Sequence, residues 1–245
     1  MFTQKKVIIF DMDGTLIDSV GVWNAVDREL IGLLGYKMVD EVKIQQQRDE
    51  ILRAFSHSKD AYLEYCDFLR ETYKASFSKE EIRTLRYKIA MTYMIEVIDF
   101  KLDAENFLHY LKQKGFTLVI ASTTSDANLK TYMTLNQNMM NKVKFEDMFT
   151  LILGRDTVSQ MKPHPQIHQF IMEKLQVLPQ ECLIIEDSLI GLEAAENAGI
   201  EVVMMYDKYS DVDRHELELR SLASFKNYQE VLKYAQQELE SKRTS

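Results

Sequence analysis

Five short hydrophobic runs, rich in β-branched residues, are spaced along the chain. Glycine or polar residues bound most of them, and a continuous apolar run of this length is typical of a strand buried on both faces of a parallel sheet. The sequence therefore predicts five interior strands, at residues 6–10, 116–121, 149–153, 182–185 and 201–205.

Between these runs, and after the last of them, the apolar residues recur at helical spacing. We expect helices at residues 103–114, 126–135, 164–175, 188–198 and 227–241. Strands that alternate with helices predict a parallel sheet covered on both faces. The expected fold class is therefore α/β, with a doubly wound parallel sheet of five or more strands.

Residues 19–100 interrupt this alternation. The segment contains no convincing strand, is rich in helix formers, and places apolar residues such as Leu52 and Phe55 at helical spacing. We expect an inserted α-helical domain at 19–100. Residues 1–18 and 101–245 would then form the α/β core.

Composition narrows the classes of function. The chain has 245 residues and a formal net charge of −8, which disfavours nucleic-acid binding through phosphate neutralisation. No apolar stretch approaches the roughly 20 residues of a membrane span. The two cysteines, Cys66 and Cys182, are far apart and form no CxxC motif, which favours a reducing, cytoplasmic setting.

Polar side chains follow three of the expected strands. Asp11, Ser122 and the pair Glu186–Asp187 stand where those strands end. In an open α/β sheet, ligands bind outside the carboxyl ends of the strands. Three carboxylates gathered there without His or Cys favour a hard cation such as Mg²⁺.

These residues belong to four ordered motifs. They are DMDGT at 11–15, Ser122 after a hydrophobic strand, Lys162 in QMKPHP, and IIEDS at 184–188. Together they resemble the haloacid dehalogenase superfamily, with Met161 where relatives commonly have glycine. The helical insertion is similar to a type-one cap, which indicates the subfamily of phosphoglycolate phosphatase and β-phosphoglucomutase.

The resemblance implies roles for the motif residues. Asp11 would be the nucleophile that forms an aspartyl phosphate, and Asp13 the general acid and then base. Ser122 and Lys162 would hold the transferring phosphoryl oxygens. Mg²⁺ would be bound by Asp11, Asp187, the backbone carbonyl of Asp13, and Glu186 either directly or as a supporting acid.

Further residues are candidates for substrate binding. Met12 and Gly14 would contribute backbone N–H groups around the phosphate. Thr123 is a candidate beside Ser122, which could instead be a helix-capping serine. In the expected cap, Arg48 could meet the substrate or lie on a solvated helix face. Trp23 could stack on a sugar or pack the hinge.

We therefore expect a Mg²⁺-dependent phosphatase that acts on a small phosphorylated metabolite, perhaps a sugar phosphate. One alternative is a sugar phosphomutase, although β-phosphoglucomutases carry a histidine at the spacing that Trp23 occupies here. Another is a non-catalytic module that binds a phosphorylated ligand. Dehalogenation is a weaker alternative, because metal-independent dehalogenases lack the second aspartate that Asp13 supplies.

The expected partners are the metabolite alone, with no nucleic acid or membrane, and the expected state is a monomer or weak homodimer.

Overall fold

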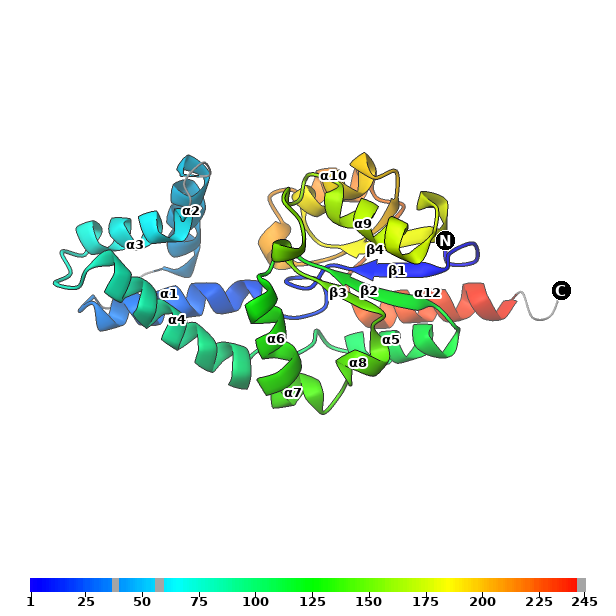
Figure 1. The fold of residues 1–245 in the computed structure, drawn as a ribbon, viewed down its shortest axis with the longest axis horizontal. Coiled ribbons are helices and arrows are strands. Elements are labelled where there is room, and N and C mark those ends of the chain that lie inside the picture. Colours follow the sequence, from blue (N-terminus) through cyan, green and yellow to red (C-terminus); the bar gives the residue numbers. More distant parts are fainter. Residues whose placement is uncertain (37–39, 56–59, 242–245) are drawn as a thin grey trace. The chain divides into compact units, whose positions relative to one another are not determined.

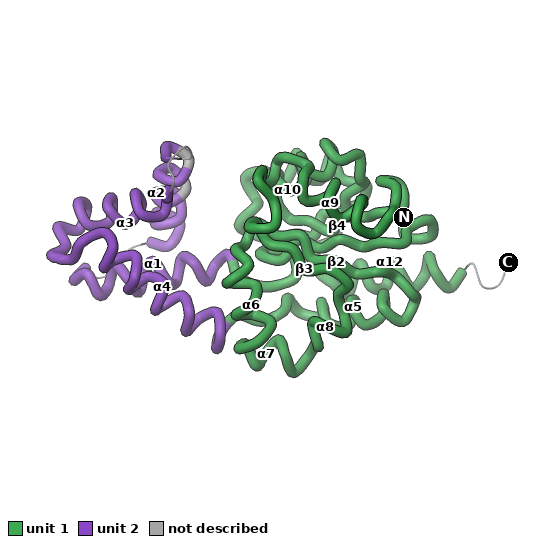
Figure 2. The backbone as a smooth tube through the Cα atoms, in the orientation of Figure 1, with its two compact units in different colours: residues 1–19, 98–245 green, residues 20–97 purple. Residues whose placement is uncertain are grey.

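The computed structural model describes residues 1–36, 40–55 and 60–241. Its contacts divide the chain into two compact units (Figure 2). The α/β unit comprises Met1–Ser19 and Ile98–Ser245, and the helical unit comprises Val20–Val97. The borders expected from the sequence lie one and three residues from these positions.

A six-stranded parallel sheet, in the order β3-β2-β1-β4-β5-β6, forms the centre of the α/β unit (Figure 1). The α/β fold class predicted from the sequence is confirmed. A sixth strand, β6, was not foreseen. The strands are β1 Val7–Phe10, β2 Thr117–Ala121, β3 Leu151–Leu153, β4 Cys182–Glu186, β5 Glu201–Met205 and β6 Ala223–Phe225.

Helices cover both faces of this sheet (Figure 1). Val7 and Ile9 of β1 join a buried cluster that includes Ile171 and Leu192 from the helices of one face. On the other face, Phe10 packs edge-on against the ring of Phe107 at a centroid distance of 6.2 Å. The helices of this unit are α5 Ala104–Gln113, α6 Asp126–Leu135, α7 Gln137–Met140, α8 Phe145–Met148, α9 Gln166–Leu175, α10 Leu189–Asn197, α11 Arg214–Arg220 and α12 Tyr228–Ser241.

The register of the three central strands decides where the candidate site forms. Phe10 pairs with Ile120 on one side and with Ile185 on the other. Parallel strands in register end at the same edge of a sheet. The residues that follow these strands therefore emerge side by side.

The helical unit contains four helices among the residues that the structure describes. Its core joins aliphatic residues such as Val26, Leu30 and Ile82 with the ring of Tyr65. Ser78 and Glu81 form a capping box at the start of the longest helix, which satisfies two backbone N–H groups there. The helices are α1 Val20–Leu33, α2 Glu41–Ala54, α3 Ala61–Thr72 and α4 Lys79–Glu96.

A buried ionic cluster ties α1, α2 and α4 together. Asp27 is fully buried and accepts hydrogen bonds from Arg48 Nη1 at 2.8 Å and Arg86 Nε at 2.6 Å. Arg48 also donates to Asn24 Oδ1 at 2.9 Å, and Arg86 lies 5.0 Å from the centre of the Trp23 ring. Arg48 is only 7% exposed, so its placement on a solvated helix face is wrong.

No helix in the described ranges combines the length and the apolar character needed to cross a membrane. Cys66 and Cys182 are both free and buried. Burial raises the pKa of each thiol to about 11.

The Asp27 cluster yields a stability prediction. Asp27→Asn leaves two buried guanidinium groups without their shared carboxylate, and breaking a buried ion pair costs about 3–5 kcal/mol. We expect the free energy of unfolding in urea to fall by that order. Glu71→Gln, at an exposed ion pair with Arg70, should change it by less than about 1 kcal/mol. Equal effects of the two substitutions would contradict the role assigned to Asp27.

Candidate active site

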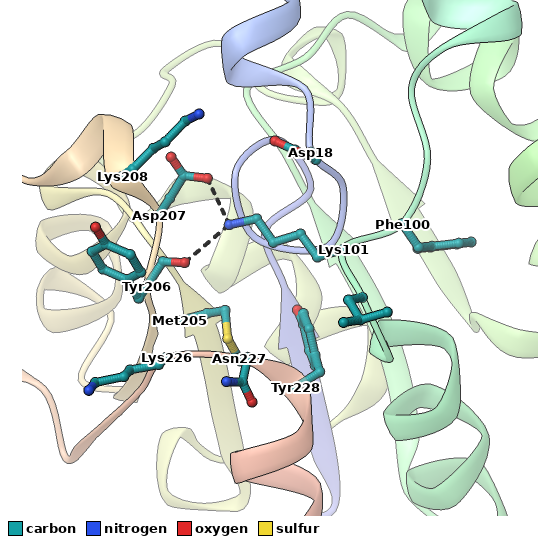
Figure 3. Close-up of a pocket in the computed structure, with 11 residues that line it drawn as sticks. Asp18, Phe100, Lys101, Met205, Tyr206, Asp207, Lys208, Lys226, Asn227 and Tyr228 are labelled. Carbon is teal, nitrogen blue, oxygen red and sulfur yellow. Dashed lines mark hydrogen bonds and ion pairs between the residues drawn. The ribbon is translucent and has the colours of Figure 1, made fainter.

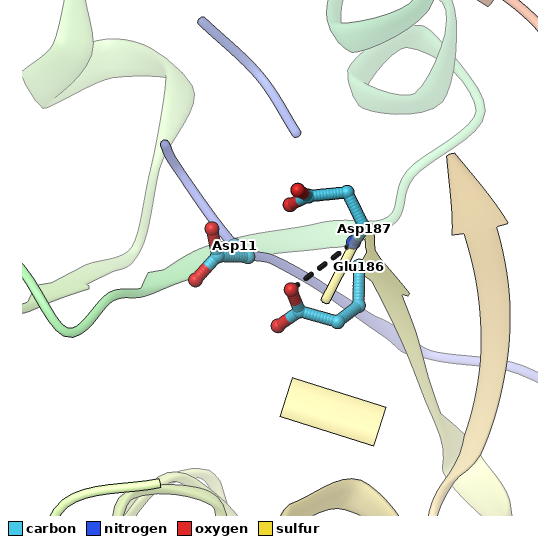
Figure 4. Close-up of side chains that lie close together, drawn as sticks. All are labelled: Asp11, Glu186 and Asp187. Atoms are coloured by element: carbon cyan, nitrogen blue, oxygen red, sulfur yellow. Dashed lines mark hydrogen bonds between the residues drawn. The ribbon is translucent and has the colours of Figure 1, made fainter. Parts of the chain in front are cut away.

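Three carboxylates meet at the carboxyl edge of the sheet (Figure 4). Asp11 follows β1, Glu186 ends β4, and Asp187 comes next. Each is buried, and each offers a carboxylate oxygen that lies within 4.8 Å of the others. The structure thus brings Asp11 together with two acids that follow it by 175 and 176 positions in the sequence.

Lys162 bridges two of these acids. It lies between β3 and α9, and its Nζ is 2.8 Å from both Asp11 Oδ1 and Glu186 Oε2. Burial alone would lower the pKa of this ammonium group, but the charges of Asp11 and Glu186 outweigh burial and raise it. Lys162 is therefore a permanent positive charge beside Asp11.

One lysine does not balance the negative charge of the cluster. Burial, followed by the charge of Glu186, raises the pKa of Asp11 to about 8, although Lys162 acts in the opposite direction. Burial, followed by the charges of Glu186 and Asp11, also raises the pKa of Asp187. A carboxylate whose anionic form is this unfavourable gains from a nearby cation. An all-oxygen donor set fits a hard divalent ion.

Asp13 occupies a separate polar niche. Its Oδ1 accepts a hydrogen bond from Ser19 Oγ at 2.5 Å, and its Oδ2 accepts one from Thr124 Oγ1. Part of the residue remains accessible, yet the surrounding protein excludes enough water to raise the pKa of its carboxyl group. The side chain of Asp13 therefore lies outside the three-carboxylate cluster, and Asp13 would be a ligand only through its backbone.

Ser122 lies at the end of β2 and is 2% exposed. Its Oγ accepts a hydrogen bond from the Thr124 N–H at 3.0 Å. Among the described residues its own O–H has no acceptor, so it can donate to a bound oxyanion. The helix-capping alternative for Ser122 is wrong because Ser125 caps α6 by accepting from the Asn128 N–H. Thr123 lies beside Ser122 at the edge of a narrow cavity that Lys162 also lines.

The turn after β1 is shaped by Gly14. Its φ is +83°, and a Cβ at this position would lie 2.4 Å from Asp187 Oδ2. The Gly14 N–H donates to the Ile17 carbonyl at 3.0 Å. The sequence analysis expected this N–H to bind phosphate, but in the structure the turn already uses it. The N–H of Met12 meets no protein acceptor in the described ranges and remains available to a ligand.

Hydroxyl groups that the sequence analysis did not assign hold Asp187 in place. Thr15 Oγ1 donates to Asp187 Oδ1 at 2.7 Å, and Ser210 Oγ donates to Oδ2 at 3.3 Å. Because Thr15 is the last residue of the DMDGT motif, the sequence could have indicated that it belongs to the site. Nothing in the sequence around Ser210 or Thr124 indicated that they would support carboxylates.

Glu186 is held by the turn that begins α10. Its Oε1 accepts hydrogen bonds from the N–H groups of Asp187 and Ser188 and from Ser188 Oγ. Its Oε2 accepts from Lys162 at 2.8 Å. Both oxygens therefore have protein donors. This arrangement favours Glu186 as the residue that positions Lys162, and direct metal ligation by Glu186 stays a prediction.

The two candidates from the expected cap belong to the helical unit. Trp23 packs against its core, and Arg48 donates to Asp27 and Asn24. Their roles toward a substrate stay predictions.

With this geometry in hand, comparison with known proteins identifies the family. The sequence profile of the haloacid dehalogenase-like hydrolases matches residues 8–205. The chain belongs to this family. The match contains every residue of the carboxylate cluster, together with Ser122 and Lys162.

Curated relatives of this hydrolase include named phosphatases. The chain is 29% identical over 201 residues to a phosphoglycolate phosphatase of Vibrio vulnificus, covering 80% of this chain and 81% of the relative. It is 26% identical over 199 residues to a bifunctional riboflavin kinase/FMN phosphatase of Arabidopsis thaliana. That match covers 81% of this chain but only 48% of the plant protein.

Solved structures show the same fold. A candidate β-phosphoglucomutase of Thermotoga maritima superposes with a TM-score of 0.76 at 21% identity, covering 95% of this chain and 99% of the other. Because the two sequences are only 21% identical, this similarity shows a shared fold and nothing more.

The tight packing of α10 against Glu186 yields a prediction for this hydrolase. A Cβ on Gly191 would lie 1.9 Å from Glu186 Oε2. We expect Gly191→Ala to displace Glu186, release Lys162 from one partner, and destabilise the fold by about 1–3 kcal/mol through overpacking. Urea unfolding measures the loss. Gly32→Ala is the control, because a Cβ at Gly32 would meet nothing within 4 Å. Gly115→Ala is unsuitable as a control because Gly115 has a positive φ. An unchanged unfolding midpoint for Gly191→Ala would contradict the contact.

Proposed function

We propose that this hydrolase is a phosphatase that removes the phosphoryl group from a small phosphorylated metabolite through an aspartyl phosphate on Asp11. The observation that carries the proposal is the Lys162 ammonium, 2.8 Å from Asp11 Oδ1, beside two further buried acids. An anionic nucleophile can approach an anionic ester only where positive charge offsets their repulsion.

The proposed metal is Mg²⁺. Asp11, Asp187 and the backbone carbonyl of Asp13 would hold it, with Glu186 as a direct or supporting acid. When bound, it would neutralise charge on the transferring phosphoryl oxygens and on the crowded carboxylates. The ordered hydroxyls of Thr15 and Ser210 keep Asp187 oriented for this task.

The first half of the reaction transfers the phosphoryl group to the protein. A carboxylate oxygen of Asp11 attacks phosphorus, and the bond between phosphorus and the ester oxygen breaks. Asp13, whose raised pKa favours its protonated form, donates its proton to the leaving oxygen. Lys162, the Ser122 hydroxyl and the Met12 N–H hold the remaining phosphoryl oxygens.

The second half releases phosphate. The Asp13 carboxylate accepts a proton from water as the water oxygen attacks phosphorus. The bond between phosphorus and Asp11 breaks, inorganic phosphate leaves, and both aspartates return to their starting forms. Splitting the hydrolysis in this way replaces one difficult step by two easier ones.

The proposed substrate class is a phosphate monoester of a small metabolite, with sugar phosphates first. Names of relatives support this class: besides the phosphoglycolate phosphatases, a Thermotoga maritima protein that is 24% identical over 196 residues is called a phosphorylated carbohydrates phosphatase. A mutase remains the second candidate because of the fold shared with the candidate β-phosphoglucomutase. Trp23, in place of the histidine expected in that subfamily, weighs against it.

The nucleophile can be tested directly. Asp11→Asn removes the attacking carboxylate, and we expect kcat for a panel of sugar phosphates, phosphoglycolate and FMN to fall by about 10³-fold or more. Asp147→Asn, at an exposed surface aspartate, serves as the matched control and should retain full activity. Turnover by Asp11→Asn at the parent rate would exclude the mechanism. Accumulation of an isomerised sugar phosphate instead of inorganic phosphate would identify a mutase.

The metal can be tested both by thermal unfolding and by activity. We expect saturating Mg²⁺ to raise the melting temperature of the protein, because a ligand at 100 times its Kd stabilises the folded state by about 2.7 kcal/mol. Asp187→Asn should remove most of this shift, whereas Asp147→Asn should keep it. EDTA should abolish phosphate release. Full activity in EDTA, or an equal Mg²⁺ shift in Asp187→Asn, would contradict the proposed site.

A further inference from the structure

The two hydroxyl groups that hold Asp187 are themselves supported in different ways. Thr15 lies in the turn after β1, where its carbonyl accepts a hydrogen bond from the buried Tyr228 hydroxyl at 3.0 Å. Ser210, whose Oγ donates to Asp187 Oδ2 at 3.3 Å, is the last residue of a one-turn 3₁₀ helix, η3 Lys208–Ser210. None of the three residues of η3 is buried. The turn therefore needs a contact outside itself to fix the Ser210 hydroxyl.

Asp207, the residue before η3, provides this contact. Its Oδ1 accepts a hydrogen bond from the Tyr209 N–H at 2.8 Å, and its backbone carbonyl accepts one from the Ser210 N–H at 3.1 Å. Asp207 thus caps the turn with its side chain and closes it with its backbone. Asp207 is buried, and a buried carboxylate is costly unless a cation or hydrogen bonds compensate its charge.

Lys101 supplies the compensating cation (Figure 3). Its Nζ donates to Asp207 Oδ2 at 2.7 Å and to the Tyr206 carbonyl at 3.2 Å. Lys101 precedes Asp207 by 106 positions, and its N–H donates to the Leu16 carbonyl at 2.8 Å. One lysine therefore connects the turn after β1 to the two residues that lead into η3.

Lys208 lies beside Asp207 but does not share this role. Its Nζ lies 4.9 Å from the centre of the Tyr209 ring, and its side chain is exposed. Within the described ranges, Lys101 is the one ammonium group that forms an ion pair with Asp207. The two lysines thus offer a comparison between a paired and an unpaired charge next to the same carboxylate.

We propose that Lys101 and Asp207 are positioning residues for the metal site: their ion pair fixes η3, and η3 holds the Ser210 hydroxyl against Asp187. This inference rests on the proposed function, because it takes Asp187 as a ligand of Mg²⁺. Loss of the partners that orient a metal ligand typically weakens metal affinity by about 10–100-fold.

The charge of Lys101 alone would have the opposite effect on the metal. The pKa of Asp187 is raised first by burial, and the charge of Lys101 acts to lower it. A positive charge that acts on Asp187 also repels a divalent cation bound there. If Lys101 acted only through its charge, its removal would strengthen Mg²⁺ binding, whereas a positioning role predicts weaker binding. The sign of the change therefore separates the two.

The Kd of the full-length protein for Mg²⁺, measured by calorimetry with MgCl₂ alone, tests the proposal. We expect a Kd raised about tenfold by Ser210→Ala and about threefold or more by Lys101→Met, which acts through the turn. Lys101→Arg keeps the charge and the donors and should restore most of the affinity. Lys208→Met removes the same charge from the neighbouring exposed lysine and is the matched control, which should not weaken binding.

Combined variants test the path of the effect. If Lys101 acts through Ser210, then Lys101→Met should change the Kd of Ser210→Ala by less than about twofold. Saturating Mg²⁺ should return kcat of Lys101→Met close to the parent value, because the ion pair supports the metal and not the chemistry. Should Lys101→Met not fold, Asp207→Asn, which breaks the same ion pair, takes its place in both tests.

An equal or lower Kd in Lys101→Met, or losses that add in the double variant, would overturn the proposal. If Asp187→Asn still abolishes Mg²⁺ binding in that case, the proposed metal site stands without it. A wild type that releases no phosphate, but loses Mg²⁺ affinity through Lys101→Met, would refute the proposed function and support the positioning role. A wild type that does not bind Mg²⁺ would overturn both.

Discussion

The candidate site depends on the burial of three carboxylates together at one edge of the sheet. Asp11, Glu186 and Asp187 have oxygens within 4.8 Å of one another, and Lys162 supplies the one ammonium group bonded to them among the described residues. Burial, and then repulsion from Glu186, raise the pKa of Asp11 to about 8. Hydrogen bonds from Thr15, Ser188 and Ser210 offset part of this cost. The cost that these hydrogen bonds do not offset favours the binding of a cation beside the three carboxylates.

The register of β1 against its two neighbours creates this crowding. Because Phe10 is level with both Ile120 and Ile185, the residues that follow must share one small volume. The sheet itself is held by apolar side chains on both faces, so hydrophobic burial stabilises an arrangement that electrostatics alone would disrupt. Gly14 and Gly191 complete the fit, because a Cβ at either position would overlap a carboxylate of the cluster.

The sequence predicted the parts of the fold whose pattern is strong. The run KVIIF and its four counterparts form strands, as their short apolar pattern predicts. The expectation that all five are buried is wrong for β3, which lies at the edge of the sheet and leaves Leu151 and Ile152 only partly buried. β6, at Ala223–Phe225, has three residues and a partly exposed pattern, so its periodicity carries almost no signal. Likewise, the motifs located Asp11 and Lys162, whereas the hydroxyls of Thr124 and Ser210 are ordinary in sequence and gain meaning only from tertiary contacts. Arg48 shows the same limit, since its burial against Asp27 depends on three helices packing together.

The two aspartates of the DMDGT motif differ in environment, and this difference supports the two chemical roles that the proposed mechanism gives them. Asp11 faces a permanent positive charge at 2.8 Å, which favours its anion once a divalent ion offsets the neighbouring acids. Asp13 faces two hydroxyl groups, from Ser19 and Thr124, and its pKa is raised by burial. Neutral hydroxyl donors stabilise a carboxylate far less than an ammonium group does. In the proposed mechanism, the residue beside the lysine therefore attacks, and the residue among the hydroxyls carries the proton.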